Sequence, residues 1–131
     1  VRPERYSYAM LQETGEFVIN LTTQKLAFAT DLCGVKSGRD TDKWKEAHLT
    51  PVPGKAVKAP LIKESPVSLE CRVRQAMALG SHTMFVAEGG SGSGGEADLD
   101  KNKRVHLEKT DPICYFPGMY FSPGQAKGKF W

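Results

Sequence analysis

Two short segments of this 131-residue chain bring together groups that bind anions. Arg2, Arg5 and Ser7 lie at the start of a segment expected to be helical, where free backbone N–H groups and the helix dipole favour negative charge. Residues 37–40 (Ser-Gly-Arg-Asp), followed by Lys43, combine small hydrogen-bonding residues with cations. Both segments are compatible with a bound phosphate, but a solvated helix start would look the same.

The remaining candidate groups indicate no metal site and no hydrolytic site. The histidines are scattered without metal-ligand spacing, and a lone histidine is usually structural or solvated: His48, His82 and His106. No GxSxG motif accompanies the serines. The cysteines are odd in number and far apart, which fits neither a disulfide framework nor a CxxC site: Cys33, Cys71 and Cys114. A reducing cytoplasm is therefore the expected compartment.

Composition predicts one globular domain over residues 1–131, with 40% hydrophobic and 25% charged residues and a mean hydropathy of −0.40. The net charge of +3 is spread along the chain, so we expect no nucleic-acid partner. No apolar run approaches the roughly 20 residues of a membrane-spanning helix, and the first residues do not have the apolar core and small-residue cleavage site expected of a secretory signal. Because Val1 is not methionine, the chain is expected to be processed, trimmed or part of something longer.

The first 60 residues are predicted to contain three helices and one strand. A helix is expected over 3–14, ended by Gly15, and a strand over 16–21, where β-branched and aromatic residues cluster. Further helices are expected over 24–33, capped by Thr22 or Thr23 and ended by Gly34, and over 41–47, capped by Asp40. A proline-containing extended loop follows at 49–60.

A β-hairpin is predicted next. Val67, Leu69, Cys71 and Val73 alternate with polar residues, which is typical of a half-exposed strand with Cys71 on its apolar face. A turn at 79–81 leads to a second strand over 83–88.

Residues 89–95 are all Gly or Ser. Gly and Ser have few side-chain atoms to pack, and glycine loses the most backbone entropy on ordering, so we expect a flexible linker. The segment resembles an engineered linker more than a natural loop. A phosphate-binding glycine loop is disfavoured because no Lys-Ser/Thr pair follows.

The last third of the chain is predicted to be rich in turns. A turn is expected over 98–103 and a short strand over 104–107. Residues 114–124 then alternate aromatic residues with Gly and Pro. These aromatic side chains would cover a planar ligand or plug the open end of a barrel, and the pattern does not separate the two.

Ordered sequence blocks over nearly the whole chain resemble the flavin reductase-like, FMN-binding split-barrel family, which includes the flavoredoxins. The blocks are RPERYSY at 2–8, GEFVINL at 15–21, ATD at 29–31 with Cys33 and Gly34, SGRD at 37–40 with Asp42 and Lys43, LTP at 49–51, AP at 59–60, ESPV at 64–67, LEC at 69–71, LGSH at 79–82, LEK at 107–109 and GKF at 128–130. The resemblance implies a mainly β fold with peripheral helices, an FMN-binding split β-barrel. It also implies a homodimer with FMN near the subunit interface and NAD(P)H or a redox protein as partner.

The resemblance also implies roles for individual residues. Arg5 and Ser7 match the stretch at the phosphate end of FMN, and Lys43 matches a lysine that contacts the flavin. His82 matches a histidine at the cofactor site. An aromatic contact near the ring is expected from Tyr115 or Phe116.

Two departures from the family pattern bear on activity. Family members ordinarily carry early barrel strands ahead of the Val1 block, so the barrel is expected to be N-terminally incomplete. Gly and Ser replace a β-branched run at 89–95. The alternatives to an active oxidoreductase are a truncated or engineered derivative that folds without activity, and an interaction module that pairs through exposed strand edges.

Overall fold

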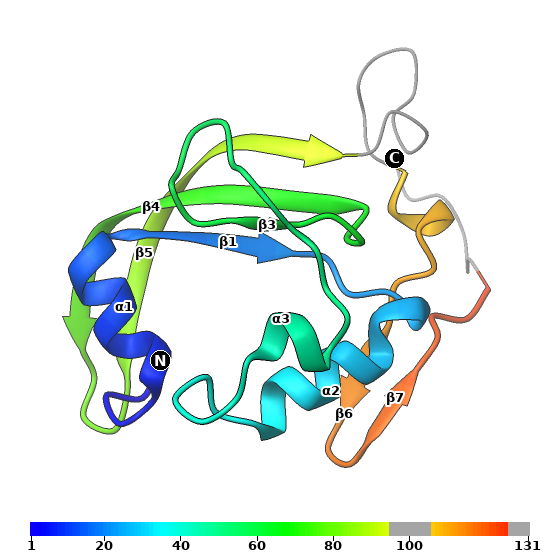
Figure 1. Cartoon of the computed structure of the whole chain (residues 1–131), viewed down its shortest axis with the longest axis horizontal. Coiled ribbons are helices and arrows are strands. Elements are labelled where there is room, and N and C mark those ends of the chain that lie inside the picture. Colours follow the sequence, from blue (N-terminus) through cyan, green and yellow to red (C-terminus); the bar gives the residue numbers. More distant parts are fainter. Residues whose placement is uncertain (95–105, 126–131) are drawn as a thin grey trace.

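A three-stranded antiparallel sheet is the main element of the computed structural model, which describes residues 1–94 and 106–125 (Figure 1). Its strand order is β1-β4-β5, formed by Glu16–Asn20, Val67–Ala78 and Thr83–Gly94. The tight β4–β5 turn contains Gly80 at φ +76°, a conformation that glycine adopts without strain. The predicted strand at 16–21 and the predicted hairpin are therefore confirmed.

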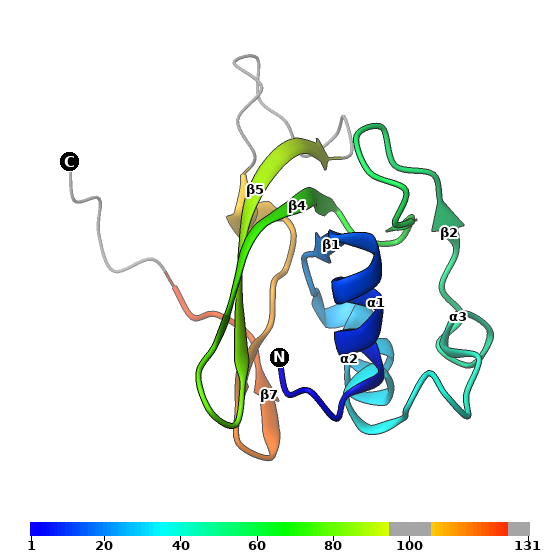
Figure 2. The same cartoon turned by 90° about the vertical axis from the view of Figure 1, so that its left-hand side faces the viewer.

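The helices lie to one side of this sheet (Figure 2). Helix α1, Tyr6–Thr14, ends at Gly15, whose φ of +63° is the left-handed conformation that stops a helix. The short helix η1, Gln24–Leu26, leads into α2, Ala27–Val35, and α3 is a single turn, Lys43–Glu46.

The smaller elements are two short antiparallel ladders and one helical turn. They are β2 with β3 at Pro51–Val52 and Leu61–Ile62, η3 at Leu107–Lys109, and β6 with β7 at Cys114–Phe116 and Met119–Phe121. More of the described residues thus lie in strands than in helices, as the mainly β prediction requires. Among the described residues, no helix has the length and apolar character needed to cross a bilayer.

Several helix boundaries differ from the prediction: α1 begins at Tyr6 and not at residue 3, the helix predicted over 24–33 is divided into η1 and α2, and the helix predicted over 41–47 is confined to Lys43–Glu46. Gly34 lies inside α2, because its backbone stays helical and the helix ends one residue later, at Val35. Asp42, and not Asp40, caps α3: its carboxylate accepts a hydrogen bond from the Lys45 backbone N–H at 3.3 Å. Both candidate caps are aspartates, so composition alone could not choose between them.

The expected linker at 89–95 is wrong for the residues that the structure describes. Residues 89–94 continue β5 and pair with β4, with Gly92 opposite Leu69 and Gly94 opposite Val67. Ladder hydrogen bonds use only backbone groups, so a strand can form without side chains when a neighbouring strand supplies the partners. The predicted turn at 98–103 and most of the predicted strand at 104–107 lie outside the described residues; Leu107 begins η3.

Two polar residues of β4 point inward, whereas the alternating pattern predicts that the polar residues of this strand are exposed. Ser68 and Glu70 are 2% and 1% exposed, whereas Leu69 is 44% exposed. Ser68 donates to the Asn20 side chain at 2.8 Å, and Glu70 accepts backbone hydrogen bonds from the chain that covers it. Cys71 is buried, as predicted.

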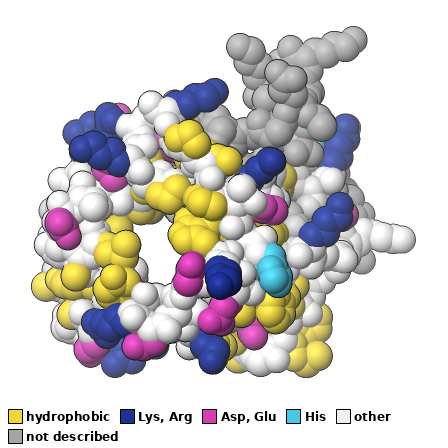
Figure 3. Space-filling view, in the orientation of Figure 1, with side chains coloured by type: hydrophobic (Ala, Val, Ile, Leu, Met, Phe, Trp, Pro, Cys, Tyr) yellow, Lys and Arg dark blue, Asp and Glu magenta, His cyan; other side chains and the backbone are white. Residues whose placement is uncertain are grey.

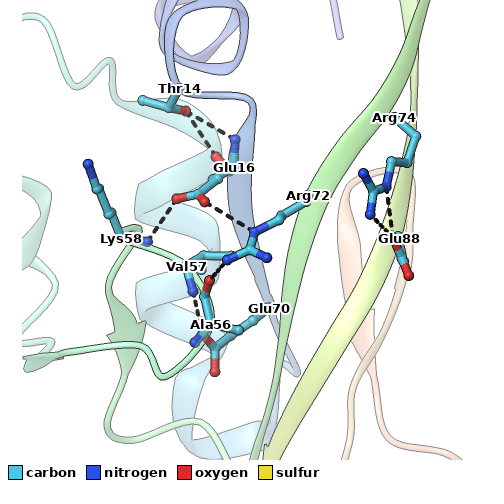
Figure 4. Close-up of polar contacts among 9 residues, drawn as sticks. All are labelled: Thr14, Glu16, Ala56, Val57, Lys58, Glu70, Arg72, Arg74 and Glu88. Atoms are coloured by element: carbon cyan, nitrogen blue, oxygen red, sulfur yellow. Dashed lines mark hydrogen bonds and ion pairs between the residues drawn. The ribbon is translucent and has the colours of Figure 1, made fainter.

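Two carboxylates fasten the loop at 54–58 to the sheet (Figure 4). Glu70 Oε2 accepts from the N–H groups of Ala56 and Val57 at 2.6 and 2.9 Å. Glu16 Oε2 accepts from the Lys58 N–H at 2.8 Å, and Arg72 links Glu16 Oε1 to the Ala56 carbonyl. Backbone hydrogen bonds, from Ala56 to Glu70 and from Lys58 to Glu16, are the main cause that lowers the pKa of each carboxyl.

The buried hydrophobic cluster lies between the helices and not on the sheet. Leu26, Ala29 and Ala47 form it, and the partly buried side chains around it are Leu32, Cys33 and Leu49. This cluster fixes α2 against α3, and it thereby positions the intervening loop at 36–42.

Replacing Gly54 by alanine is expected to destabilise the fold by about 1–3 kcal/mol. An added Cβ would lie 2.6 Å from the Val57 carbonyl oxygen and 2.7 Å from Glu70 Oε2, and Glu70 Oε2 cannot move without weakening its bonds to Ala56 and Val57. Urea unfolding monitored by circular dichroism measures the change.

Gly34→Ala is the matched control. A Cβ there meets nothing within 4 Å, and alanine in a helix is favoured over glycine by roughly 0.5–1 kcal/mol, so this variant should be slightly stabilised. Equal effects of the two substitutions would contradict the described packing of the 54–58 loop.

Candidate functional site

A cavity of about 570 Å³ lies between α1 and the segment that joins α2 to α3. Figure 3 shows this face hollowed there, with hydrophobic side chains along part of the margin and charged side chains along the rest. We call it the polar cavity; its lining comes from Arg5, Tyr6, Ser7 and Met10, from residues 33–38 and from residues 41–44.

Three of the residues predicted to bind a ligand line the polar cavity: Arg5, Ser7 and Lys43. They come from two segments far apart in the sequence, which the fold brings to one place. Lys36 adds a third cation, against the single carboxylate of Asp42, which is engaged as the cap of α3. The cavity wall therefore favours an anion.

The ammonium of Lys43 is held in place. Its Nζ donates to the Cys33 carbonyl oxygen in the last turn of α2 at 2.7 Å. A lysine ammonium has three N–H donors, so this bond leaves donors for a ligand.

Arg39 packs on the start of α1, against Tyr6, which lines the polar cavity. Its guanidinium carbon lies 5.6 Å from the Tyr6 ring centroid, and its Nη2 donates to the Glu4 carbonyl at 3.3 Å. Gly38 allows the approach, since a Cβ there would lie 3.2 Å from the Tyr6 ring. Sequence reasoning missed Tyr6, and the only signal was the glycine between Ser37 and Arg39.

The structure does not place the other three predicted residues in the polar cavity. His82 lies at the β4–β5 turn, exposed, with its Nδ1 2.9 Å from Ser81 Oγ. Tyr115 and Phe116 are in β6 and are 62% and 61% exposed.

The β6–β7 hairpin that carries these aromatic residues instead contacts α2. The Tyr120 hydroxyl donates to the Asp31 carboxylate at 3.4 Å. The pKa of the Tyr120 hydroxyl is raised, mainly by desolvation and to a smaller extent by the negative charge of Asp31.

A second cavity of about 600 Å³ adjoins the first, and Ser7 and Met10 line both. We call it the apolar cavity, because most of its remaining wall is hydrophobic: Val1, Leu11, Phe17, Val18, Ala59, Met84 and Phe85, with Glu16 and Thr83. The two cavities therefore meet along Ser7 and Met10.

Within the described part of the chain, no three His, Cys, Asp or Glu side chains are grouped closely enough to hold a metal ion. Cys33, Cys71 and Cys114 are all free. The chemistry that the residues of the polar cavity offer is anion binding.

Solved structures share this architecture over nearly the whole chain. Flavoredoxin of Desulfovibrio vulgaris (Miyazaki F) is similar with a TM-score of 0.90 and 29% identity, covering 98% of this chain and 70% of that one. Flavoredoxin from Methanosarcina acetivorans gives a TM-score of 0.88 and 27% identity, with 98% and 69% coverage.

Curated relatives are uncharacterized proteins. One from Archaeoglobus fulgidus is 40% identical over 84 residues, which is 64% of this chain and 48% of that protein. One from Aquifex aeolicus is 30% identical over 109 residues, 83% of this chain and 56% of that protein. The chain thus spans about half the length of these two relatives.

The fold is that of the split-barrel flavin reductase and flavoredoxin structures. Residues 1–124 match the model of the flavin reductase like domain, and the chain belongs to that family.

Proposed function

We propose that the chain binds FMN with its phosphate in the polar cavity. The observation that carries the proposal is the convergence of Arg5, Ser7 and Lys43 on one cavity at the N-terminus of α1. The similarity to two flavoredoxins and the flavin reductase family match support it.

The donors and the size of the polar cavity fit this group. A phosphate monoester carries between one and two negative charges near neutral pH, which a guanidinium, an ammonium and a hydroxyl can meet. The first backbone N–H groups of a helix add further donors. The volume of about 570 Å³ lies within the range of roughly 300–1,000 Å³ that small-molecule sites occupy.

Bound FMN would supply hydride or electron transfer between NAD(P)H or a redox protein and an acceptor. The chain's own residues bind and orient: Lys43 and Arg5 hold the phosphate, while Ser7 and Met10 form the boundary between the two cavities. The proposal includes a homodimer in the reducing cytoplasm, which the family resemblance and the three free cysteines support.

FMN is expected to bind at least about tenfold more tightly than riboflavin, which lacks the phosphate. Titration of each flavin with the protein, followed by flavin fluorescence, measures the two dissociation constants. Added salt should weaken FMN binding and leave riboflavin binding nearly unchanged. Equal affinities would contradict the phosphate site, and absence of binding by either flavin would favour the silent derivative.

A measurement of NAD(P)H oxidation distinguishes flavin binding from oxidoreductase activity. Oxidation of NAD(P)H that depends on added FMN would support the oxidoreductase. FMN binding without any such oxidation would be compatible with a redox-protein electron donor and with the derivative that folds without activity.

A further inference from the structure

The polar cavity has two walls that come from different parts of the chain. The start of α1 supplies Arg5, Tyr6 and Ser7, and the segment at 33–44 supplies the other wall, with Lys43. In Figure 1, the loop between α2 and α3 reaches toward the start of α1. A charge-assisted N–H···O bond spans only about 2.7–2.9 Å, so a phosphate that contacts both walls requires them at a fixed separation.

Helix α1 is held in place by few packing contacts. None of its residues is buried, and the hydrophobic cluster between α2 and α3 includes none of its side chains. On the side of the sheet, the Tyr8 ring packs edge-on against Phe85 of β5, with 5.9 Å between the ring centroids. That contact fixes α1 to the sheet, and other groups must set its distance from the loop at 36–42.

Arg39 connects the two walls. Its guanidinium carbon lies 5.6 Å from the Tyr6 ring centroid, within the range of a cation–π contact, and its Nη2 donates to the Glu4 carbonyl at 3.3 Å. Between residues 1–14 and residues 33–44, which the structure describes in full, this is the one hydrogen bond.

The backbone of Arg39 is fixed to the wall that carries Lys43. The Arg39 N–H donates to Ser37 Oγ at 3.2 Å, and Lys43 Nζ donates to the Cys33 carbonyl at 2.7 Å in the same segment. Arg39 itself does not line the polar cavity. Its guanidinium therefore acts on a ligand there through the residues that it holds.

We propose that Arg39 is a positioning residue for phosphate binding, which places Arg5 and Ser7 at the correct distance from Lys43 by holding the Tyr6 ring. The proposal rests on the function proposed above. Tyr6 stands between Arg5 and Ser7 and begins α1, so a displacement of Tyr6 moves both neighbours with it. A guanidinium suits this role because its planar face stacks on a ring while its N–H groups donate to a carbonyl.

A double-mutant cycle on FMN affinity tests this role. Arg39→Gln removes the cation over the Tyr6 ring but keeps a terminal N–H donor, and it should weaken FMN binding by about three- to tenfold. In a chain that already carries Tyr6→Leu, the same substitution should change FMN affinity by less than about twofold, because the ring on which Arg39 acts is gone. Fluorescence titration with FMN measures all four affinities.

Two controls separate positioning from the loss of a charge and from a general loss of structure. Lys45→Gln removes one positive charge from α3 at an exposed position outside the cavity, and its FMN affinity should stay within about twofold of the parent value. Riboflavin has no phosphate, so its affinity should be unchanged in Arg39→Gln, whereas a general disturbance of the fold would weaken both flavins.

Three results with a parent chain that binds FMN would overturn the proposal. They are an unchanged FMN affinity in Arg39→Gln, equal fold-losses from this substitution with and without the Tyr6 ring, and a parallel loss of riboflavin affinity. A parent chain that binds no FMN would instead overturn the proposed function, and this inference with it, so the two failures are distinguishable.

Discussion

Lys43→Met is expected to weaken FMN binding by about 10- to 100-fold. A hydrogen bond to a charged group contributes about 1.5–3 kcal/mol, and methionine retains the length of the side chain without the charge. The Lys43 ammonium lines the polar cavity and is anchored on the Cys33 carbonyl, so no reorganisation is needed to meet a phosphate. Fluorescence titration with FMN and with riboflavin measures the effect, and riboflavin affinity should change little.

Lys45→Met is the matched control, since Lys45 lies in the same helix, is exposed and does not line the cavity. Its FMN affinity should stay within about twofold of the parent value. Lys43→Arg should restore part of the affinity, because the cation returns. Thermal unfolding of Lys43→Met checks that loss of the bond to Cys33 has not unfolded the loop. Equal losses in the Lys43 and Lys45 variants would argue against a phosphate at this place.

Glu70→Gln is expected to lower the melting temperature by roughly 5 °C or more. The Glu70 carboxylate is 1% exposed and accepts two backbone hydrogen bonds from the 54–58 loop. Its Oε1 is buried without a partner among the described residues, so an amide NH₂ at that position would be a buried donor left unsatisfied. Differential scanning calorimetry measures the change, with the exposed Glu13→Gln of α1 as control.

The same carboxylates predict how stability depends on pH. The pKa values of Glu70, Glu16 and Glu64 lie below the ordinary value of 4.5, chiefly because of the hydrogen bonds each accepts. A depressed folded-state pKa means that the unfolded state binds protons first, so the stabilisation is complete above pH 4.5 and is lost as pH falls through the folded-state values. Melting temperatures measured from pH 7 to pH 3 should therefore decrease once the pH is below 4.5. The decrease should be less steep in Glu70→Gln. Equal slopes would contradict the role of Glu70.

Local patterns predicted the β-hairpin, because alternation and the Gly80 turn are both encoded within neighbouring residues. They could not predict that Glu70 points inward, since its partners are backbone groups of a loop 13 and 14 residues away. The Gly/Ser segment was misassigned for the same reason: its partner strand, and not its own residues, makes it extended.

The candidate site was predictable only in part. Arg5, Ser7 and Lys43 carry chemistry that is visible in the sequence, and the fold places them together. Tyr6 and Arg39 contact each other across a tertiary interface, which no spacing in the sequence reveals. His82 was predicted from the family resemblance, and Tyr115 and Phe116 from the resemblance together with the aromatic pattern at 114–124; these three residues line neither cavity.

The β4–β5 hairpin has unequal halves, which bears on how the domain assembles. Near the Gly80 turn, the paired residues include Met77 with Met84 and Ala76 with Phe85, so side chains reinforce the ladder. Toward Gly94, Gly92 faces Leu69 and Gly94 faces Val67, so only one partner of each of these pairs carries a side chain. The hairpin should therefore nucleate at its turn and zip toward Gly94, and thermal fraying should proceed in the opposite direction.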